Sequence, residues 1–107
     1  MPWLVRDNEV LASLELADGR AARRKGLLGR DDFEGVLRLK ALSVHTLGMR
    51  FPIDVAMCDS GGMVRKVLTM RPWRVSAPRP AAPVVYEARA GTFRDWNLRP
   101  GDVLEVR

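Results

Sequence analysis

Cysteine and histidine are nearly absent from this sequence of 107 residues, which holds one of each, Cys58 and His45. A single cysteine cannot form a disulfide within the chain, and this excludes the disulfide-stapled class of small domains. One histidine and one cysteine also cannot supply the four ligands of a conventional structural zinc site. We therefore expect neither a metal nor another cofactor. Because Cys58 follows Val55, Ala56 and Met57, we expect its thiol to be buried and inert.

Long hydrophobic runs are also missing, although apolar residues make up 47% of the chain. No run approaches the ~20 apolar residues that a membrane-spanning helix needs, so we expect no membrane association. The first residues lack the basic start and the apolar stretch of a secretion signal, which predicts a cytoplasmic location. A length suited to one hydrophobic core predicts a single soluble domain over residues 1–107.

Acidic residues are absent from residues 60–86. The formal net charge of the chain is +5, and such a field attracts anions. Arginine binds carboxylates through two parallel hydrogen bonds. Within residues 60–86, aromatic side chains do not alternate with the basic ones as they do on surfaces that stack nucleic-acid bases. We therefore expect an anionic ligand or an acidic protein as partner, and no nucleic acid. The basic residues expected to form the rim of the binding surface are Arg71, Arg74 and Arg79.

The first half of the chain predicts one strand and one helix. Apolar side chains at every second position predict a half-buried strand over residues 10–16. Residues 20–28, rich in alanine, arginine and leucine, favour a short helix that Asp18 caps and Gly29 ends. Residues 36–39 form a further short extended segment.

The second half predicts a hairpin followed by a long loop. Residues 53–58 and 63–68 are apolar segments on either side of the turn 59–62, whose two glycines tolerate positive φ. Four prolines then interrupt residues 70–83 and exclude a helix or a central strand there. We expect an exposed basic loop, in which Trp73 is a candidate anchor for a partner.

Short strands at residues 84–88 and 103–106, with one helical turn at 92–96 between them, complete the pattern. No helical segment long enough for a βαβ crossover separates the strands. The expected fold class is mainly β, as a compact β-barrel or sandwich-like single domain with one short N-terminal helix.

Three segments together resemble a known family. The first ends in Gly26-Leu27-Leu28-Gly29-Arg30, the second leads from Val44 into Pro52-Ile53-Asp54-Val55, and the third is Val85 to Gly91 with the turn Pro100-Gly101-Asp102. Their order and spacing are similar to the DUF192 family of uncharacterised bacterial and archaeal proteins. His45 stands where that family has tryptophan, and residues 46–49 replace its Met-Lys-Asn-Thr. The resemblance implies a compact, mainly β fold with one short helix, and no established reaction. The matching residues are Arg23, Gly26, Leu27, Arg30, Pro52, Asp54, Glu87, Gly91, Gly101 and Asp102.

Two carboxylates, Asp54 and Glu87, interrupt apolar strands. A buried charge needs a partner, and the candidates are Arg23 and Arg30 at the two ends of the expected helix. These groups either form ion pairs that fix the helix on the barrel or line a polar pocket. We expect at least one of the two carboxylates to be buried and paired with arginine.

His45 is the natural candidate for a general base, because imidazole exchanges protons most readily near neutral pH. Asp54 would then orient its ring. The structural alternative is that one ring nitrogen bonds the backbone, and we favour it because a lone histidine is a weak signal of catalysis.

Two functions of different classes remain. The first is a non-catalytic domain that binds an anionic small ligand or an acidic protein segment. The second is a small hydrolase-like or isomerase-like enzyme, with His45 as base and Asp54 or Glu87 as its partner. The sequence favours binding because it contains no complete catalytic set, and no residue is assigned as catalytic. The expected pocket consists of Arg23, Arg30, His45, Thr46, Asp54 and Glu87.

Overall fold

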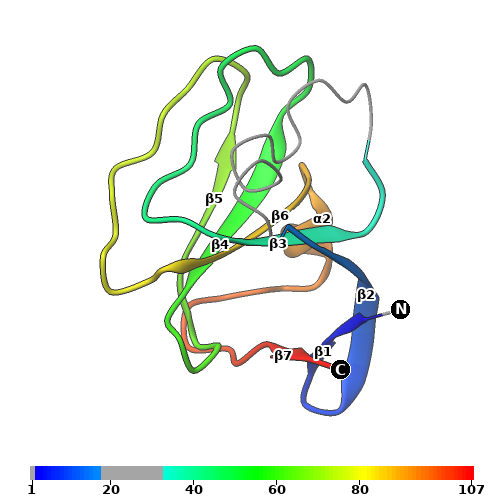
Figure 1. The fold of residues 1–107 in the computed structure, drawn as a ribbon. Coiled ribbons are helices and arrows are strands. Elements are labelled where there is room, and N and C mark those ends of the chain that lie inside the picture. The colour runs from blue at the N-terminus through cyan, green and yellow to red at the C-terminus, as the bar shows by residue number, and fades with distance from the viewer. Residues whose placement is uncertain (1, 18–32) are drawn as a thin grey trace.

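The computed structural model of the protein describes residues 2–17 and 33–107. The helix expected at residues 20–28, together with Arg23 and Arg30, lies outside these residues. The described strands form one mixed seven-stranded sheet in the order β5-β4-β6-β3-β2-β1-β7 (Figure 1). The elements are β1 (Trp3–Arg6), β2 (Glu9–Leu16), β3 (Val36–Lys40), β4 (Ile53–Cys58), β5 (Val64–Met70), β6 (Val84–Arg89), α2 (Thr92–Asp95) and β7 (Glu105–Val106).

The β4–β5 hairpin turns at residues 59–62, which confirms the prediction from the glycine-containing turn. Asp59 holds this turn, because its Oδ1 accepts hydrogen bonds from the amides of Gly61 and Met63, both at 3.0 Å. β4 also pairs antiparallel with β6, whereas β2 and β3 run parallel. The sheet is therefore mixed, which alternation within single segments did not indicate.

The expected barrel or sandwich-like arrangement is wrong, because the described strands form one sheet that stays open with β5 and β7 at its two edges. The edges approach each other at an isolated bridge between Met63 and Val103 and at a hydrogen bond of 2.8 Å from the Val64 amide to the Asp102 carbonyl. β7 has only two residues, too few to extend these contacts into a continuous ladder.

The short helix of the described residues is α2, and it lies in the C-terminal region. The helix expected near the N-terminus falls outside the described residues. α2 coincides with the helical turn that the sequence predicts at 92–96. Within the described ranges, no helix is long and apolar enough to cross a membrane.

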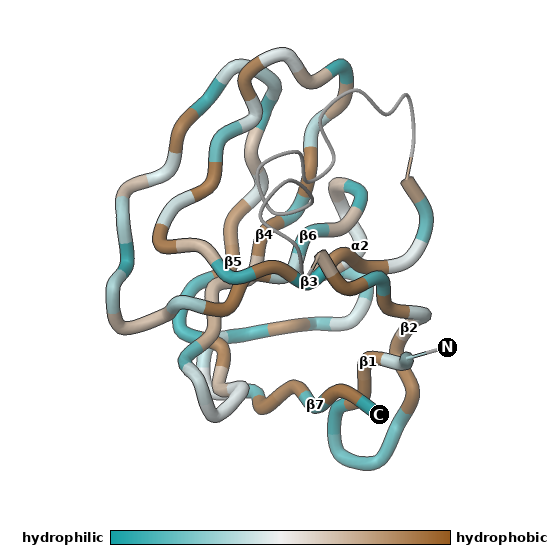
Figure 2. Tube along the Cα trace, viewed as in Figure 1, coloured by the Kyte–Doolittle hydropathy of each residue, from teal (hydrophilic) through white to brown (hydrophobic). Residues whose placement is uncertain are grey.

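Both faces of the sheet are buried. One face carries the loop-side cluster, which faces the loops that precede β4 and follow β5. It includes Leu37, Val55, Val85, Met70 at the end of β5, and Val44 in the loop before β4. The opposite face carries the helix-side cluster. Side chains alternate between the faces along each strand, so a residue's parity decides which cluster it joins. Figure 2 shows hydrophobic residues concentrated along the strands and hydrophilic ones in the turn between β1 and β2. The helix-side cluster includes Leu4, Val36, Cys58, Tyr86, Phe93 and Leu104.

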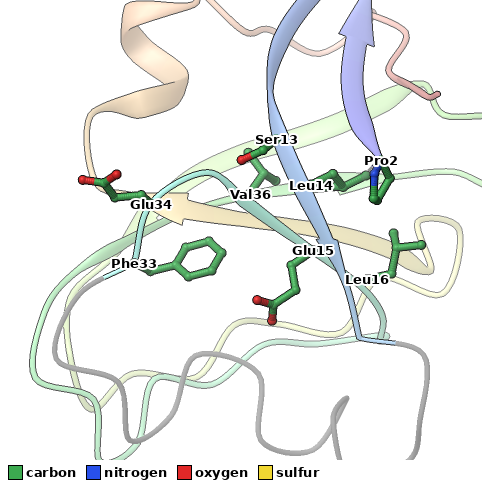
Figure 3. A pocket seen from close by; sticks show the side chains of 8 residues that line it. All are labelled: Pro2, Ser13, Leu14, Glu15, Leu16, Phe33, Glu34 and Val36. Atoms are coloured by element: carbon green, nitrogen blue, oxygen red, sulfur yellow. The ribbon is translucent and has the colours of Figure 1, made fainter.

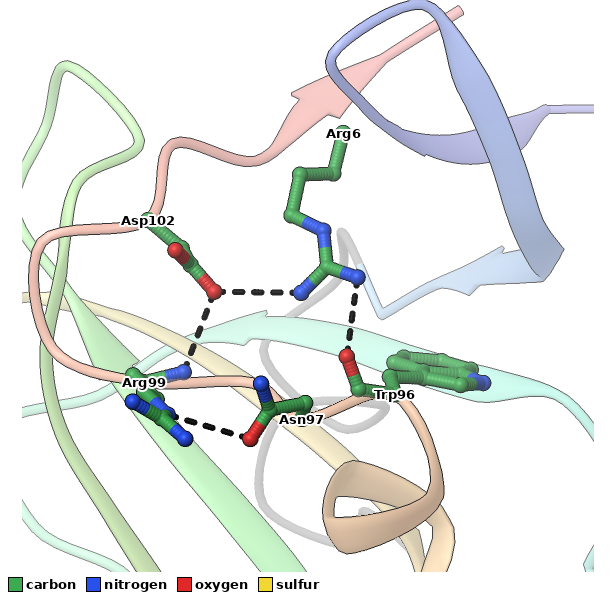
Figure 4. A network of polar contacts seen from close by, with 5 residues as sticks. All are labelled: Arg6, Trp96, Asn97, Arg99 and Asp102. Atoms are coloured by element: carbon green, nitrogen blue, oxygen red, sulfur yellow. Dashed lines mark hydrogen bonds and ion pairs between the residues drawn. The ribbon is translucent and has the colours of Figure 1, made fainter.

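Arg6 ties β1 to the turn that precedes β7 (Figure 4). Its guanidinium donates hydrogen bonds to Asp102 Oδ2 at 3.1 Å and to the Trp96 carbonyl at 2.8 Å. Asp102 Oδ2 also accepts a hydrogen bond from the Arg99 amide at 3.0 Å. Asp102 therefore stabilises the turn between α2 and β7 and anchors β1 beside it.

Gly62 should be one of the positions least tolerant of substitution. Its φ is +92°, and a Cβ atom there would lie 2.4 Å from the Leu104 carbonyl oxygen. We expect Gly62→Ala to lower the free energy of unfolding by about 1–3 kcal/mol from the left-handed backbone alone. Urea denaturation measures this loss. Gly61→Ala is the matched control, because its Cβ would meet only Asp59 Oδ1 at 3.4 Å, and equal losses in both variants would contradict the argument.

Candidate functional site

Asp54 and Glu87 point to opposite faces of the sheet. In the register of β4 and β6, Asp54 lies opposite Ala88, whereas Glu87 lies opposite Val55. Directly paired residues project to the same face. Because Ala88 belongs to the helix-side cluster and Val55 to the loop-side cluster, the sheet separates the two carboxylates. They cannot line one pocket together.

Asp54 is 3% exposed, which confirms the expected burial, and three donors surround its carboxylate. Oδ1 accepts a hydrogen bond of 2.6 Å from the Thr69 hydroxyl. Oδ2 accepts bonds of 3.0 Å from the amides of Gly91 and Phe93. These amides belong to the start of α2, so a side chain from β4 satisfies backbone donors that the helix leaves open. Among the described residues its hydrogen bonds come from a hydroxyl and two amides. The expected arginine partners, Arg23 and Arg30, lie outside these residues.

Glu87 is 4% exposed on β6, in the middle of the sheet. Its paired neighbours, Leu37 on β3 and Val55 on β4, are apolar. Burial raises the pKa of its carboxyl from the ordinary 4.5 to about 7. No hydrogen bond or ion pair joins it to another described residue. Glu87 is therefore a buried carboxyl group with neither a hydrogen-bond donor nor a positive charge beside it among the described residues.

His45 and Thr46 lie in the loop before β4, where their hydrogen bonds go to loop backbone. His45 is exposed, and its Nδ1 accepts a bond of 3.3 Å from the Leu47 amide. Thr46 is fully buried, and its hydroxyl donates to the Arg71 carbonyl at 2.6 Å and accepts from the Arg74 amide at 2.9 Å. Thr46 thus joins two loops, and the structure places neither residue in contact with Asp54.

The basic loop follows β5 and is exposed over most of residues 71–81, as the sequence predicts. Arg71, Arg74 and Arg79 are all exposed there. Met70 and Ala82 are buried and fix its two ends to the loop-side cluster.

A polar pocket of about 330 Å³ lies where the two edges of the open sheet approach each other. The turn 59–62, residues from β3 and β6, and residues 104–106 line this Arg38 pocket. Arg38 is the cationic residue among them. It lies between the buried Leu37 and Leu39, but its Cα partner is Tyr86, whose side chain belongs to the helix-side cluster. The sequence analysis did not single out Arg38 as a site residue. The feature that could have indicated it is a charged residue within an otherwise apolar strand.

The Arg38 guanidinium is incompletely satisfied. Its Nε is buried and has no hydrogen-bond partner in the described part of the chain. Burial raises the pKa of Tyr86, and a hydrogen bond from Arg38 together with its positive charge opposes that rise. A buried donor without an acceptor costs free energy that a ligand oxygen would recover.

Two carboxylates line the Arg38 pocket, but each has partners of its own. The pKa of Asp59 is lowered chiefly by the hydrogen bond from the Met63 amide, and its Oδ2 also accepts from Arg65 Nε at 3.3 Å. Glu105 pairs with Arg107 at 3.2 Å. The unsatisfied group of the pocket is therefore its cation.

The described residues around this pocket include neither a reactive thiol nor a set of metal ligands. Burial, with a smaller contribution from the charge of Asp59, raises the pKa of the Cys58 thiol to about 12. This confirms a buried thiol, and at neutral pH it stays protonated and weakly nucleophilic. Over residues 2–17 and 33–107, no group of three His, Cys, Asp or Glu side chains is placed to hold a metal ion.

A larger pocket of about 520 Å³ lies beside β2 and the start of β3 (Figure 3). Its walls are mainly apolar, from residues such as Leu14, Phe33 and Val36. The charged residues that line it are Glu15 and Glu34, on opposite sides of Phe33 in the close view. The part of its lining that the structure describes contains no Arg or Lys side chain, so this pocket offers no cationic donor to the ligand class that the overall charge favours.

Comparison with known sequences gives a family match over nearly the whole chain. The model of the DUF192 family, described as "Uncharacterized ACR", matches residues 4–106. A UPF0127 protein of Pyrococcus abyssi is 31% identical over an alignment of 99 positions, which covers 86% of this chain and 84% of that protein. A UPF0127 protein of Pyrococcus furiosus is 28% identical over an alignment of 108 positions, which covers 95% of this chain and 93% of that protein.

Two solved structures share the fold. A protein of Sinorhizobium meliloti, described as a candidate transcription regulator, superposes with a TM-score of 0.84 at 22% identity, covering 98% of this chain and 91% of that one. A protein of unknown function from Novosphingobium aromaticivorans superposes with a TM-score of 0.80 at 16% identity, covering 97% of this chain and 82% of that one. At these identities the likeness concerns the fold alone.

Proposed function

The chain belongs to the DUF192 family, and within this uncharacterised family we propose that it is a non-catalytic domain that binds a small anionic ligand in the Arg38 pocket. The observation that carries the proposal is the buried Nε of Arg38, which has no acceptor among the described residues. A carboxylate or phosphate oxygen would accept its hydrogen bond once the Arg38 side chain turns this buried atom toward the pocket, and a planar guanidinium suits both groups.

The size and surroundings of the pocket fit a small ligand. Its volume of about 330 Å³ lies at the lower end of the range for small-molecule sites. The net charge of +5 raises the local concentration of anions around the molecule. The Tyr86 hydroxyl, beside Arg38, offers a second polar contact for ligand orientation.

Binding is better supported than catalysis by His45. The His45 Nδ1 accepts the Leu47 amide, so this nitrogen is engaged in local structure. The candidate partner Asp54 already accepts three hydrogen bonds around α2. An enzyme that uses His45 with Asp54 would have to break these contacts before its groups could act together.

The Arg38 pocket can be tested with inorganic phosphate and acetate as probes, by calorimetry and thermal unfolding. We expect either anion to raise the thermal midpoint of the wild-type protein. At a hundredfold excess over Kd, the free energy of unfolding should rise by about 2.7 kcal/mol. Arg38→Gln should abolish this ligand-dependent part, and Tyr86→Phe should weaken it.

The matched control is Arg94→Gln, which removes one positive charge from an exposed position on α2. It should retain the wild-type response. General salt effects on stability act on all variants alike and cancel in the comparison. An equal midpoint rise in wild type and Arg38→Gln, or none in either, would overturn the proposal.

A further inference from the structure

Two loops far apart in the sequence form one ribbon, here called the loop pair and made of residues 41–49 and 71–79. The Arg79 amide donates to the Leu42 carbonyl at 2.7 Å, and the Ser76 amide donates to the Val44 carbonyl at 2.8 Å. The Thr46 amide donates to the Arg74 carbonyl at 2.8 Å. The two loops run beside each other at one side of the molecule (Figure 1). These bonds give an otherwise irregular region a defined outer face.

The outer face of the loop pair is apolar. Val44 and Thr46 are buried, so alternation turns His45 and Leu47 outward. His45 forms an isolated antiparallel bridge with Val75, which is 66% exposed. Large side chains exposed together in this way mark interaction sites on soluble proteins. The exposed apolar residues of the ribbon are Leu42, Leu47, Trp73 and Val75.

Trp73 is the most conspicuous of them. It is 65% exposed, and its φ of +63° is a left-handed conformation that bulky residues seldom adopt. Its amide donates to the Thr46 carbonyl at 2.8 Å, which helps to hold this conformation. The fold therefore keeps a large aromatic side chain in water on a constrained backbone, as expected for an anchor of a protein interface.

The charge around this face has one sign. The loop pair, residues 41–49 and 71–79, contains three arginines and neither aspartate nor glutamate. Arg71, Arg74 and Arg79 are exposed, and none forms an ion pair with another described residue. A partner that covers the apolar residues must therefore bring negative charge to the surrounding arginines.

We infer that the loop pair is a docking surface for an acidic protein segment that carries apolar side chains among its carboxylates. This inference goes beyond the proposed function and is independent of it, because the loop pair shares no residue with the Arg38 pocket. Tryptophan and arginine are the residue types that contribute most at protein interfaces. Four prolines within residues 72–83 stiffen the second loop and reduce the entropy lost on binding.

Nucleic acid and anionic membranes fit this surface less well. Single-stranded nucleic acid needs successive aromatic side chains for stacking, and Trp73 is the exposed aromatic residue of the loop pair. Binding to anionic lipid is typical of clusters of about four to eight Lys or Arg residues beside a membrane-spanning helix or on an amphipathic helix, whereas the loop pair carries three arginines, all on an irregular loop.

The test uses a fluorescently labelled synthetic peptide in which Asp and Glu alternate with Leu and Phe, with fluorescence anisotropy as readout. A peptide with Asn and Gln in place of the acids is the ligand control. We expect the acidic peptide to bind the full chain and the neutral one not to bind. Trp73→Ala and the double variant Arg71→Glu/Arg79→Glu should each weaken binding by about tenfold or more.

The matched protein control is Arg94→Glu/Arg99→Glu, which changes the net charge equally on exposed arginines elsewhere. It should retain most of the affinity. Arg38→Gln should bind the peptide normally, so failure at the Arg38 pocket and failure at the loop pair remain distinguishable. The inference is overturned if the peptide does not bind, if both double variants lose affinity equally, or if Trp73 is needed only for binding to phosphatidylserine vesicles or duplex DNA.

Discussion

The Asp54→Ala variant is expected to unfold at a much lower urea concentration than the wild-type protein, with a loss of about 3–5 kcal/mol in the free energy of unfolding, because two backbone amides and one hydroxyl lose their acceptor. Asp54 is 3% exposed and accepts hydrogen bonds from Thr69, Gly91 and Phe93. Hydrogen bonds to a charged acceptor are worth about 1.5–3 kcal/mol each, and alanine leaves their donors without a partner. The variant should also loosen α2, whose first amides lose their acceptor.

Two further variants separate this role from a general effect of charge. Thr69→Val removes one of the three donors and keeps the carboxylate, so it should cost less than Asp54→Ala. Asp95→Ala removes an exposed carboxylate from α2 itself and should change stability by less than about 0.5 kcal/mol. A denaturation midpoint for Asp54→Ala close to that of Asp95→Ala would reject a structural role for Asp54.

Local chemistry explains which elements could be predicted from the sequence. The β4–β5 hairpin rests on a turn in which Asp59 and Gly62 fix the backbone within a few residues. The strand at 10–16 showed a period of two, and the prolines of 70–83 excluded regular structure. β1 was missed because Trp3, Leu4 and Val5 form an unbroken apolar run too short to distinguish strand from helix.

The site was less predictable because it depends on register. Asp54 and Glu87 looked equivalent in the sequence, yet pairing of Val55 with Glu87 places the two carboxylates on opposite faces. Arg38 likewise resembled an ordinary solvated charge until its pairing with Tyr86 placed it at the pocket. Such pairings join residues distant in the chain, and an error of one residue in register would reverse each face.

Glu87 should make the protein lose stability as the pH rises from about 4.5 to 7. The folded-state pKa of its carboxyl is raised to about 7 by burial, against an ordinary 4.5. Between these values the unfolded chain releases the proton and the folded chain retains it, so rising pH favours unfolding. Below this window both states are protonated and no penalty exists. At about 1.4 kcal/mol per pH unit, the loss is complete near pH 7 and amounts to about 3 kcal/mol.

The Glu87→Gln variant isolates this contribution because its amide has similar size and does not titrate. Other carboxylates such as Asp59, whose pKa is lowered, give stability an opposite dependence on pH and remain in both proteins. The measurement is therefore the difference in free energy of unfolding between variant and wild type at several pH values. We expect the variant to gain about 3 kcal/mol relative to wild type between pH 4.5 and 8. Glu34→Gln, at an exposed position, should show a constant difference. A constant difference for Glu87→Gln as well would mean that Glu87 is ionised at neutral pH with a partner that compensates its charge.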